Sequence, residues 1–131
     1  MRDSKIYAAE NEVFKNEEIL TEIQLKKFFC RIIGDPWFKE KYGEGYKLYT
    51  VGEGYFDHSC AVFKEIYILD NVHFTEATVI HEIVHACKRV RGNPHGKAWQ
   101  KRYVEMVNRY ISMEKAEELE EAFKKLHAKK S

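Results

Sequence analysis

The chain has 131 residues, of which 44% are hydrophobic and 33% charged, with a formal net charge of +1. This length predicts a single domain over residues 1–131, and the composition is that of a soluble globular protein, which excludes a disordered chain. No apolar run approaches the roughly 18–20 residues that span a bilayer. The first residues lead into no signal-like hydrophobic segment. We therefore expect a cytoplasmic protein with no membrane partner.

The chain has three cysteines, Cys30, Cys60 and Cys87. Their odd number and the lack of any Cys-x-x-Cys spacing argue against a disulfide framework and against a cysteine zinc site. We expect each of them to behave as a small buried hydrophobic side chain.

A helix is predicted in the N-terminal third of the chain. Residues 1–15 are ambiguous between a short strand and the lead-in to a helix. From Asn16, which can cap a helix, apolar residues line one broad face. They are Ile19, Leu20, Ile23, Phe28 and Ile32. We expect this scaffold helix to end before the turn signal Gly34-Asp35-Pro36.

Two strands are predicted in the middle of the chain. Residues 37–42 fit a helical turn or a loop, and residues 46–51 predict the first strand. Residues 60–69 predict the second and clearer strand, because they are rich in β-branched and aromatic types. Thr75 then fits the N-cap of a following helix.

Residues 78–87 contain the motif His-Glu-x-x-His within a helical pattern. The apolar stripe typical of a buried helix is formed by Ile80, Ile83, Val84 and Cys87. Because His81 and His85 are four positions apart, they project from the same face and can bind one zinc ion. Glu82 points to a neighbouring sector, where a carboxylate can take a proton from water held at the metal. The alternative is an ordinary core helix with two exposed or capped histidines.

A third metal ligand is predicted just beyond this helix. Gly92 suits the left-handed position that closes a helix and Pro94 prevents its continuation, so the chain turns back and presents His95. Three protein ligands leave a fourth position for water, as in catalytic zinc sites. Glu105, 20 positions after His85, is the rival ligand, at the spacing of the thermolysin-like zinc peptidases. We prefer His95, because the Gly-x-x-His-Gly turn explains why the chain reverses there.

The stretch HEIVHACKRVRGNPHGKAW resembles the SprT-like zinc metallopeptidase core, which includes the Spartan and Wss-type proteases of DNA–protein crosslinks. The positions that match its HExxH motif and its later His-Gly-x-x-aromatic step are His81, Glu82, His85, His95, Gly96 and Trp99. The resemblance is strong over residues 75–103 and loose over residues 45–70. It implies a zinc-dependent endopeptidase with three histidine ligands and a glutamate base. The cysteine zinc ribbon that many members carry after this core is not in this sequence.

Two further helices are predicted after the His-Gly turn. The apolar stripe of the first is formed by Trp99, Tyr103, Met106, Val107 and Tyr110. The second runs from Glu114 to about His127, with Leu119, Phe123 and Leu126 on one stripe. The candidates for a hydrogen-bond donor to an oxyanion are Tyr103, Tyr110 and Arg102. The loop residue His58 is a further candidate for the metal site or for an oxyanion donor, and the alternative is a solvated loop histidine.

Basic residues concentrate between positions 88 and 109. The seven are Lys88, Arg89, Arg91, Lys97, Lys101, Arg102 and Arg109. The one acid among them is Glu105. In the simpler interpretation, which we prefer slightly, these basic residues lie on the solvated faces of two helices. Otherwise they steer an acidic protein or a DNA backbone toward the site.

These observations predict an α+β fold of zincin type, with an N-terminal helix, a small twisted sheet of two to four strands, the metal helix and two further helices. The predicted function is that of a zinc metallopeptidase acting on protein or peptide substrates. In such enzymes a sheet-edge strand can hold an extended substrate, and we favour residues 60–69 for this role. The alternatives are a zinc hydrolase acting on a non-peptide substrate, and a non-catalytic domain that binds nucleic acid through residues 88–109.

Overall fold

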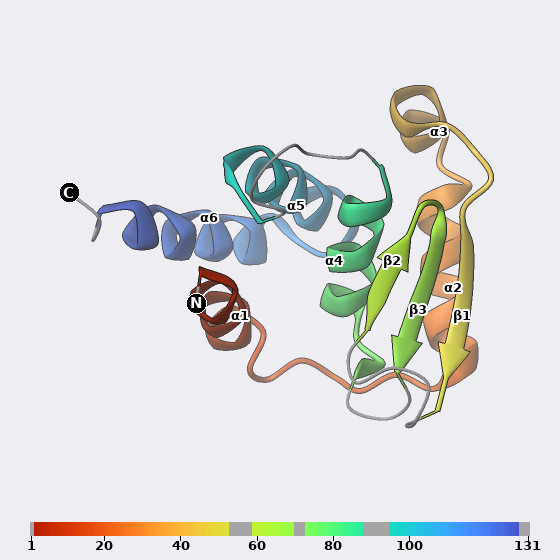
Figure 1. Cartoon of the computed structure of the whole chain (residues 1–131), viewed down its shortest axis with the longest axis horizontal. Helices are drawn as coiled ribbons and strands as arrows, with labels where there is room; N and C mark the ends of the chain where they lie inside the picture. The colour runs from red at the N-terminus through yellow and green to blue at the C-terminus, as the bar shows by residue number, and fades with distance from the viewer. Residues whose placement is uncertain (1, 53–58, 70–72, 88–94, 129–131) are drawn as a thin grey trace. The chain divides into compact units, whose positions relative to one another are not determined.

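The computed structural model describes residues 2–52, 59–69, 73–87 and 95–128 of the chain. Over these residues the protein is α+β, with six helices and one small mixed sheet of three strands (Figure 1). This confirms the α+β part of the predicted fold class, whereas the zincin type stays a prediction. None of the helices in these ranges is long and apolar enough to cross a membrane.

The chain divides into two compact units, one of residues 18–89 and one that joins residues 1–17 to residues 90–131. A single domain over residues 1–131 stays a prediction.

The sheet belongs to the unit of residues 18–89. Its strands are β1 (Lys47–Val51), β2 (Cys60–Val62) and β3 (Glu65–Leu69), in the order β1-β3-β2. β1 runs parallel to the central strand β3, and β2 runs antiparallel to it. Alternation along β3 places Ile66 and Ile68 in the core, where both are fully buried.

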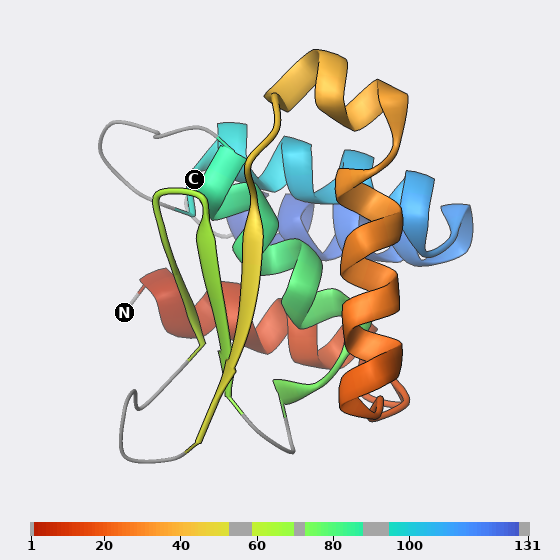
Figure 2. The ribbon, with the colours of Figure 1, turned by 90° about the vertical axis from the view of Figure 1, so that its right-hand side faces the viewer.

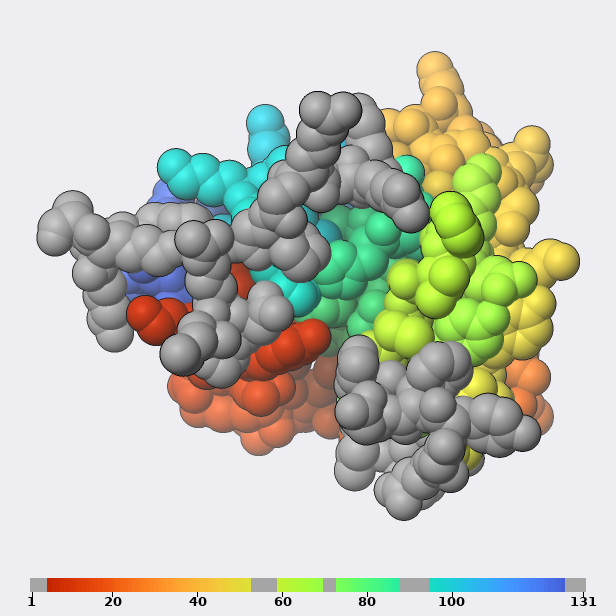
Figure 3. Space-filling model, viewed as in Figure 1, coloured from red at the N-terminus to blue at the C-terminus, as the bar shows by residue number. Residues whose placement is uncertain are grey.

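The prediction of one strand over residues 60–69 is wrong, because β2 and β3 form a hairpin. The chain turns at Phe63 and Lys64, and Phe63 has a φ of 55°, in the left-handed region. Phe63 is 76% exposed, as its place at the turn requires. The hairpin is at the molecular surface in Figure 3. Of the predicted strand, therefore, only β2 lies at an edge of the sheet.

Three helices complete this unit: α2 (Glu22–Ile33), α3 (Pro36–Tyr42) and α4 (Glu76–Cys87). α2 and α4 pack against one face of the sheet (Figure 2). Helix α3 settles the ambiguity over residues 37–42. It begins at a proline, which suits the first turn of a helix, and the side chain of Asp35 caps it.

The N-cap of α2 lies five residues after the cap predicted at Asn16. Its N-cap is Thr21, whose hydroxyl accepts a hydrogen bond from the backbone N–H of Gln24, while the Gln24 side chain accepts one from the backbone N–H of Thr21. This capping box fixes the start of the helix. The predicted core residue Ile23 is consequently 68% exposed, and the buried face is formed by Leu25, Phe28, Phe29 and Ile32. The helix ends before Gly34, as predicted.

The second unit consists of α1 (Arg2–Val13), α5 (Lys97–Tyr110) and α6 (Met113–Ala128). α6 packs against both α1 and α5. The ambiguous residues 1–15 thus contain a helix. The stripe predicted on α5 is confirmed, since Trp99, Tyr103, Met106, Val107 and Tyr110 are all buried. On α6 the predicted residues Leu119 and Phe123 are buried as well.

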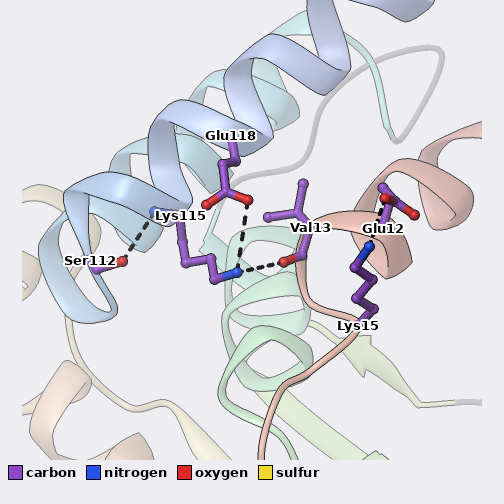
Figure 4. A network of polar contacts seen from close by, with 6 residues as sticks. All are labelled: Glu12, Val13, Lys15, Ser112, Lys115 and Glu118. Carbon is purple, nitrogen blue, oxygen red and sulfur yellow. Dashed lines mark hydrogen bonds and ion pairs between the residues drawn. The ribbon is translucent and has the colours of Figure 1, made fainter.

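A lysine at the start of α6 holds the end of α1 (Figure 4). Lys115 Nζ donates a hydrogen bond of 2.9 Å to the backbone oxygen of Val13, the last residue of α1, and lies 3.9 Å from Glu118 Oε1. The Lys115 backbone N–H in turn donates to Ser112 Oγ, which caps α6. A cation at the carbonyl end of a helix satisfies an oxygen that has no partner within the helix, and it interacts favourably with the helix dipole.

The prediction that the three cysteines are buried is wrong. Cys30 is exposed, and Cys60 and Cys87 are half-buried. Cys30 follows two buried residues of α2, Phe28 and Phe29, and the helical turn carries it away from the core. All three are free cysteines in the structure.

Candidate metal centre

α4 carries two of the predicted ligands, His81 and His85. Thr75 caps this helix as predicted, because its Oγ1 accepts a hydrogen bond from the Thr78 backbone N–H. The imidazole rings of His81 and His85 lie 4.9 Å apart between centroids, at 63° to each other. His81 is 3% exposed and His85 is half-buried. The pair therefore has the geometry that a spacing of four on a helix requires.

His95 lies two residues before α5, next to the N-cap Gly96, and is 5% exposed. Two aromatic rings contact its imidazole: Trp99 at 4.8 Å between centroids and 86°, and Tyr7 at 5.6 Å and 66°. Its backbone oxygen accepts a hydrogen bond of 2.9 Å from Gln100 Nε2, and this bond is buried. Both the backbone and the ring of His95 are thus held by neighbours.

The three histidines form a group that could hold a metal ion. Each offers one ring nitrogen, and the three atoms all lie within 4.8 Å of one another. The rival ligand Glu105 is not a member of this group; it is half-buried on α5.

Glu82, the predicted base, is 5% exposed on α4. The negative charge of Glu82 interacts electrostatically with a side chain on the edge strand β2. Burial raises the pKa of the Cys60 thiol on β2, and the negative charge of Glu82 raises it further. A buried carboxylate thus lies next to a histidine of the group in sequence and within electrostatic reach of the sheet edge.

The residues predicted to donate a hydrogen bond to an oxyanion differ in whether the structure allows that role. The hydroxyl of Tyr103 donates its only proton to Glu10 Oε2 at 2.6 Å, so it is not available to an oxyanion. Tyr110 ends α5, about 20 Å along the helix axis from its first turn, which separates it from His95. Arg102 is half-buried on α5, and His58 lies outside the described residues.

Part of the basic stretch can be located. Lys88, Arg89 and Arg91 lie outside the described residues. Lys97, Lys101 and Arg109 are exposed on α5. The exposure of these three residues agrees with the preferred interpretation, in which the basic residues lie on solvated helix faces.

The sequence alone did not predict a role for two residues of α1: Tyr7, which contacts His95, and Glu10, which accepts the hydrogen bond of Tyr103. One signal was available, because Glu10 stands on the apolar stripe of Ile6, Ala9 and Val13, and an acid there is 7% exposed. Tyr7 had no comparable signal, because its contact with His95 joins distant parts of the chain.

Comparison with known proteins identifies no relative, so the function must be inferred from the site residues. No protein-family model matches the chain, and no match is found among curated proteins or solved structures.

Proposed function

We propose that this protein is a zinc-dependent peptidase of zincin type, similar to the SprT-like core, with His81, His85 and His95 as metal ligands and Glu82 as the general base. The observation that carries the proposal is the group of three histidine nitrogens within 4.8 Å of one another. A buried carboxylate at the position after the first of them supports the catalytic part.

The donor set fits zinc. Three neutral imidazoles suit a divalent transition metal, and three protein ligands are the number found in catalytic zinc sites. A zinc ion bound there would supply a Lewis acid, which polarises a carbonyl and makes a nearby water more acidic.

The protein residues then have separate roles. The Glu82 carboxylate accepts the proton of the attacking water and afterwards delivers it to the leaving amine. Because Glu82 is nearly excluded from solvent, bulk water competes little for that proton.

The substrate would be a peptide in extended conformation. β2 is an edge strand and can add such a peptide as a further strand through main-chain hydrogen bonds. Cys60, the first residue of β2, lies within the electrostatic reach of Glu82. A peptide paired with β2 would therefore pass near the proposed base, and the role that we assigned to residues 60–69 narrows to this strand.

The experiment is metal analysis combined with peptide-library cleavage of the wild type and Glu82→Gln. We expect Glu82→Gln to keep its zinc and to lose turnover by about 10²–10⁴-fold, the usual contribution of a general base. The matched control is Glu76→Gln in the first turn of the same helix, which we expect to keep both zinc and activity. Undiminished cleavage by Glu82→Gln would refute the mechanism.

The exposed bases of α5, Lys97, Lys101 and Arg109, favour one alternative, a non-catalytic domain that binds nucleic acid. A salt-dependent shift of DNA mobility without cleavage of any peptide would support this alternative. Zinc-dependent cleavage of other amides or esters, but not of peptides, would instead indicate a non-peptide hydrolase.

A further inference from the structure

Helix α1 supplies side chains to the surroundings of His95. The ring of Tyr7 lies against the imidazole, edge to face, at 5.6 Å between centroids. Tyr7 is 43% exposed while His95 is 5% exposed, so this contact joins an exposed tyrosine to a buried imidazole.

A second route leads from α1 to the same imidazole. Glu10 stands three positions after Tyr7, one helical turn away, and its Oε2 accepts the short hydrogen bond from Tyr103. The Tyr103 ring packs edge to face on Trp99 at 4.8 Å, and Trp99 packs on His95 at 4.8 Å. Tyr103 and Trp99 are almost completely buried, so this series of contacts has little freedom to move.

We propose that Tyr7 and Glu10 are positioning residues for His95, so that α1 sets the orientation of the third metal ligand. The inference deepens the proposed function and rests on its metal site. Tyr7 acts on the imidazole directly, and Glu10 acts through Tyr103 and Trp99.

His95 needs such support more than the other two histidines. His81 and His85 lie inside a helix whose backbone hydrogen bonds fix their positions. His95 precedes α5, outside the helix, where neighbouring side chains must restrict its ring. Groups that orient a metal-binding histidine typically change metal affinity by about 10–100-fold when they are replaced.

The first test measures the zinc affinity of the metal-free full-length protein by competition with a chromogenic chelator. We expect Tyr7→Ala to weaken zinc binding about tenfold, at the low end of that range, because Trp99 still holds the ring. Tyr7→Phe keeps the aromatic edge and should restore the wild-type affinity. Lys5→Ala is the matched control, since it removes another exposed side chain of α1.

The second test uses Glu10→Gln, with Glu12→Gln as its control. Gln at position 10 keeps an acceptor for Tyr103 but removes the charge, so we expect a smaller loss of zinc affinity than in Tyr7→Ala. Glu12 is exposed and pairs with Lys15 (Figure 4), so its replacement should change nothing at the site. In Tyr7→Ala and Glu10→Gln, but in neither control, the visible absorption of the cobalt-substituted protein should shift.

The outcomes are distinguishable. Wild-type zinc affinity and cobalt spectra in both Tyr7→Ala and Glu10→Gln would overturn this inference while leaving the proposed function intact. An equal loss in Lys5→Ala would also overturn it, because α1 would then act only as a general support. Failure of the wild type to bind zinc would overturn both the inference and the proposed function.

Discussion

The histidines of the candidate metal centre are held in two different ways. His81 and His85 lie one turn apart on α4, and the helix alone sets their spacing. His95 is oriented by rings from α5 and from α1, which lies far away in the sequence. The first arrangement depends on local backbone geometry, and the second depends on tertiary packing.

This difference predicts different sensitivities. A change far from α4 in the sequence should leave the His81–His85 pair in place as long as the helix forms. The orientation of His95 should respond to changes in α1, because Tyr7 and the contact of Glu10 with Tyr103, over 93 positions, belong to its surroundings.

The largest effect is expected when a ligand itself is removed. His81→Ala and His95→Ala should each weaken zinc binding by more than about 100-fold, the upper limit for residues that only orient a ligand. The measurement is the zinc content after dialysis together with competition titration. Glu105→Ala is the control and should keep its zinc. The opposite result, with zinc lost from Glu105→Ala and kept by His95→Ala, would move the site to the thermolysin-like pattern.

A smaller effect should follow from loosening α1. Lys115→Met removes the hydrogen bond to the last carbonyl of α1, and we expect it to lower the free energy of unfolding by about 1 kcal/mol. Because α1 carries Tyr7, zinc affinity should fall as well. Urea unfolding of the metal-free protein and chelator competition measure the two quantities.

The control for this variant is Lys15→Met, which breaks an exposed ion pair with Glu12. Such pairs contribute little to stability, so both quantities should stay near their wild-type values. If the two lysine variants behave alike, α1 is not held at its end by Lys115.

The sequence predicted the part of the candidate site that depends on local geometry. The motif of residues 81–85 gave two histidines on one helical face, and the Gly-x-x-His-Gly turn pointed to His95. Tyr7 and Glu10 could not be found in this way, because a contact across the chain has no period in the sequence.

The fold shows the same limit at its turns. The hairpin within residues 60–69 has no Gly, Pro, Asn or Asp at its turn, so an unbroken strand was the natural prediction. The start of α2 was missed because Asn16 and Thr21 are both good caps in sequence. Only Thr21 has a glutamine three residues later, which completes a capping box.

The smallest effect concerns α4 itself and tests whether that helix holds its histidine pair without outside help. Burial raises the pKa of Glu76 in the first turn, and Glu18 raises it further, against the opposing effect of Arg31. Because its pKa is raised in the folded state, Glu76 does not destabilise the fold below its unfolded-state pKa, where the carboxyl group is protonated in both states. Stability is then lost as the pH rises through the folded pKa. Glu76→Gln removes this cost, so its melting temperature should match the wild type near pH 3 and slightly exceed it at pH 7.

The zinc affinity of Glu76→Gln should stay unchanged at pH 7, because the backbone of α4 still sets the spacing of His81 and His85. Glu22, in the same unit, should show the opposite pH dependence of stability. Its hydrogen bond and charge interaction with Lys26 lower its pKa, so Glu22→Gln should lose stability at pH 7 and match the wild type in acid. Thermal melts across this pH range, with zinc titrations at pH 7, measure both variants. If Glu76→Gln alters zinc affinity while the helix stays folded, the pair depends on more than its spacing, and the contrast with His95 disappears.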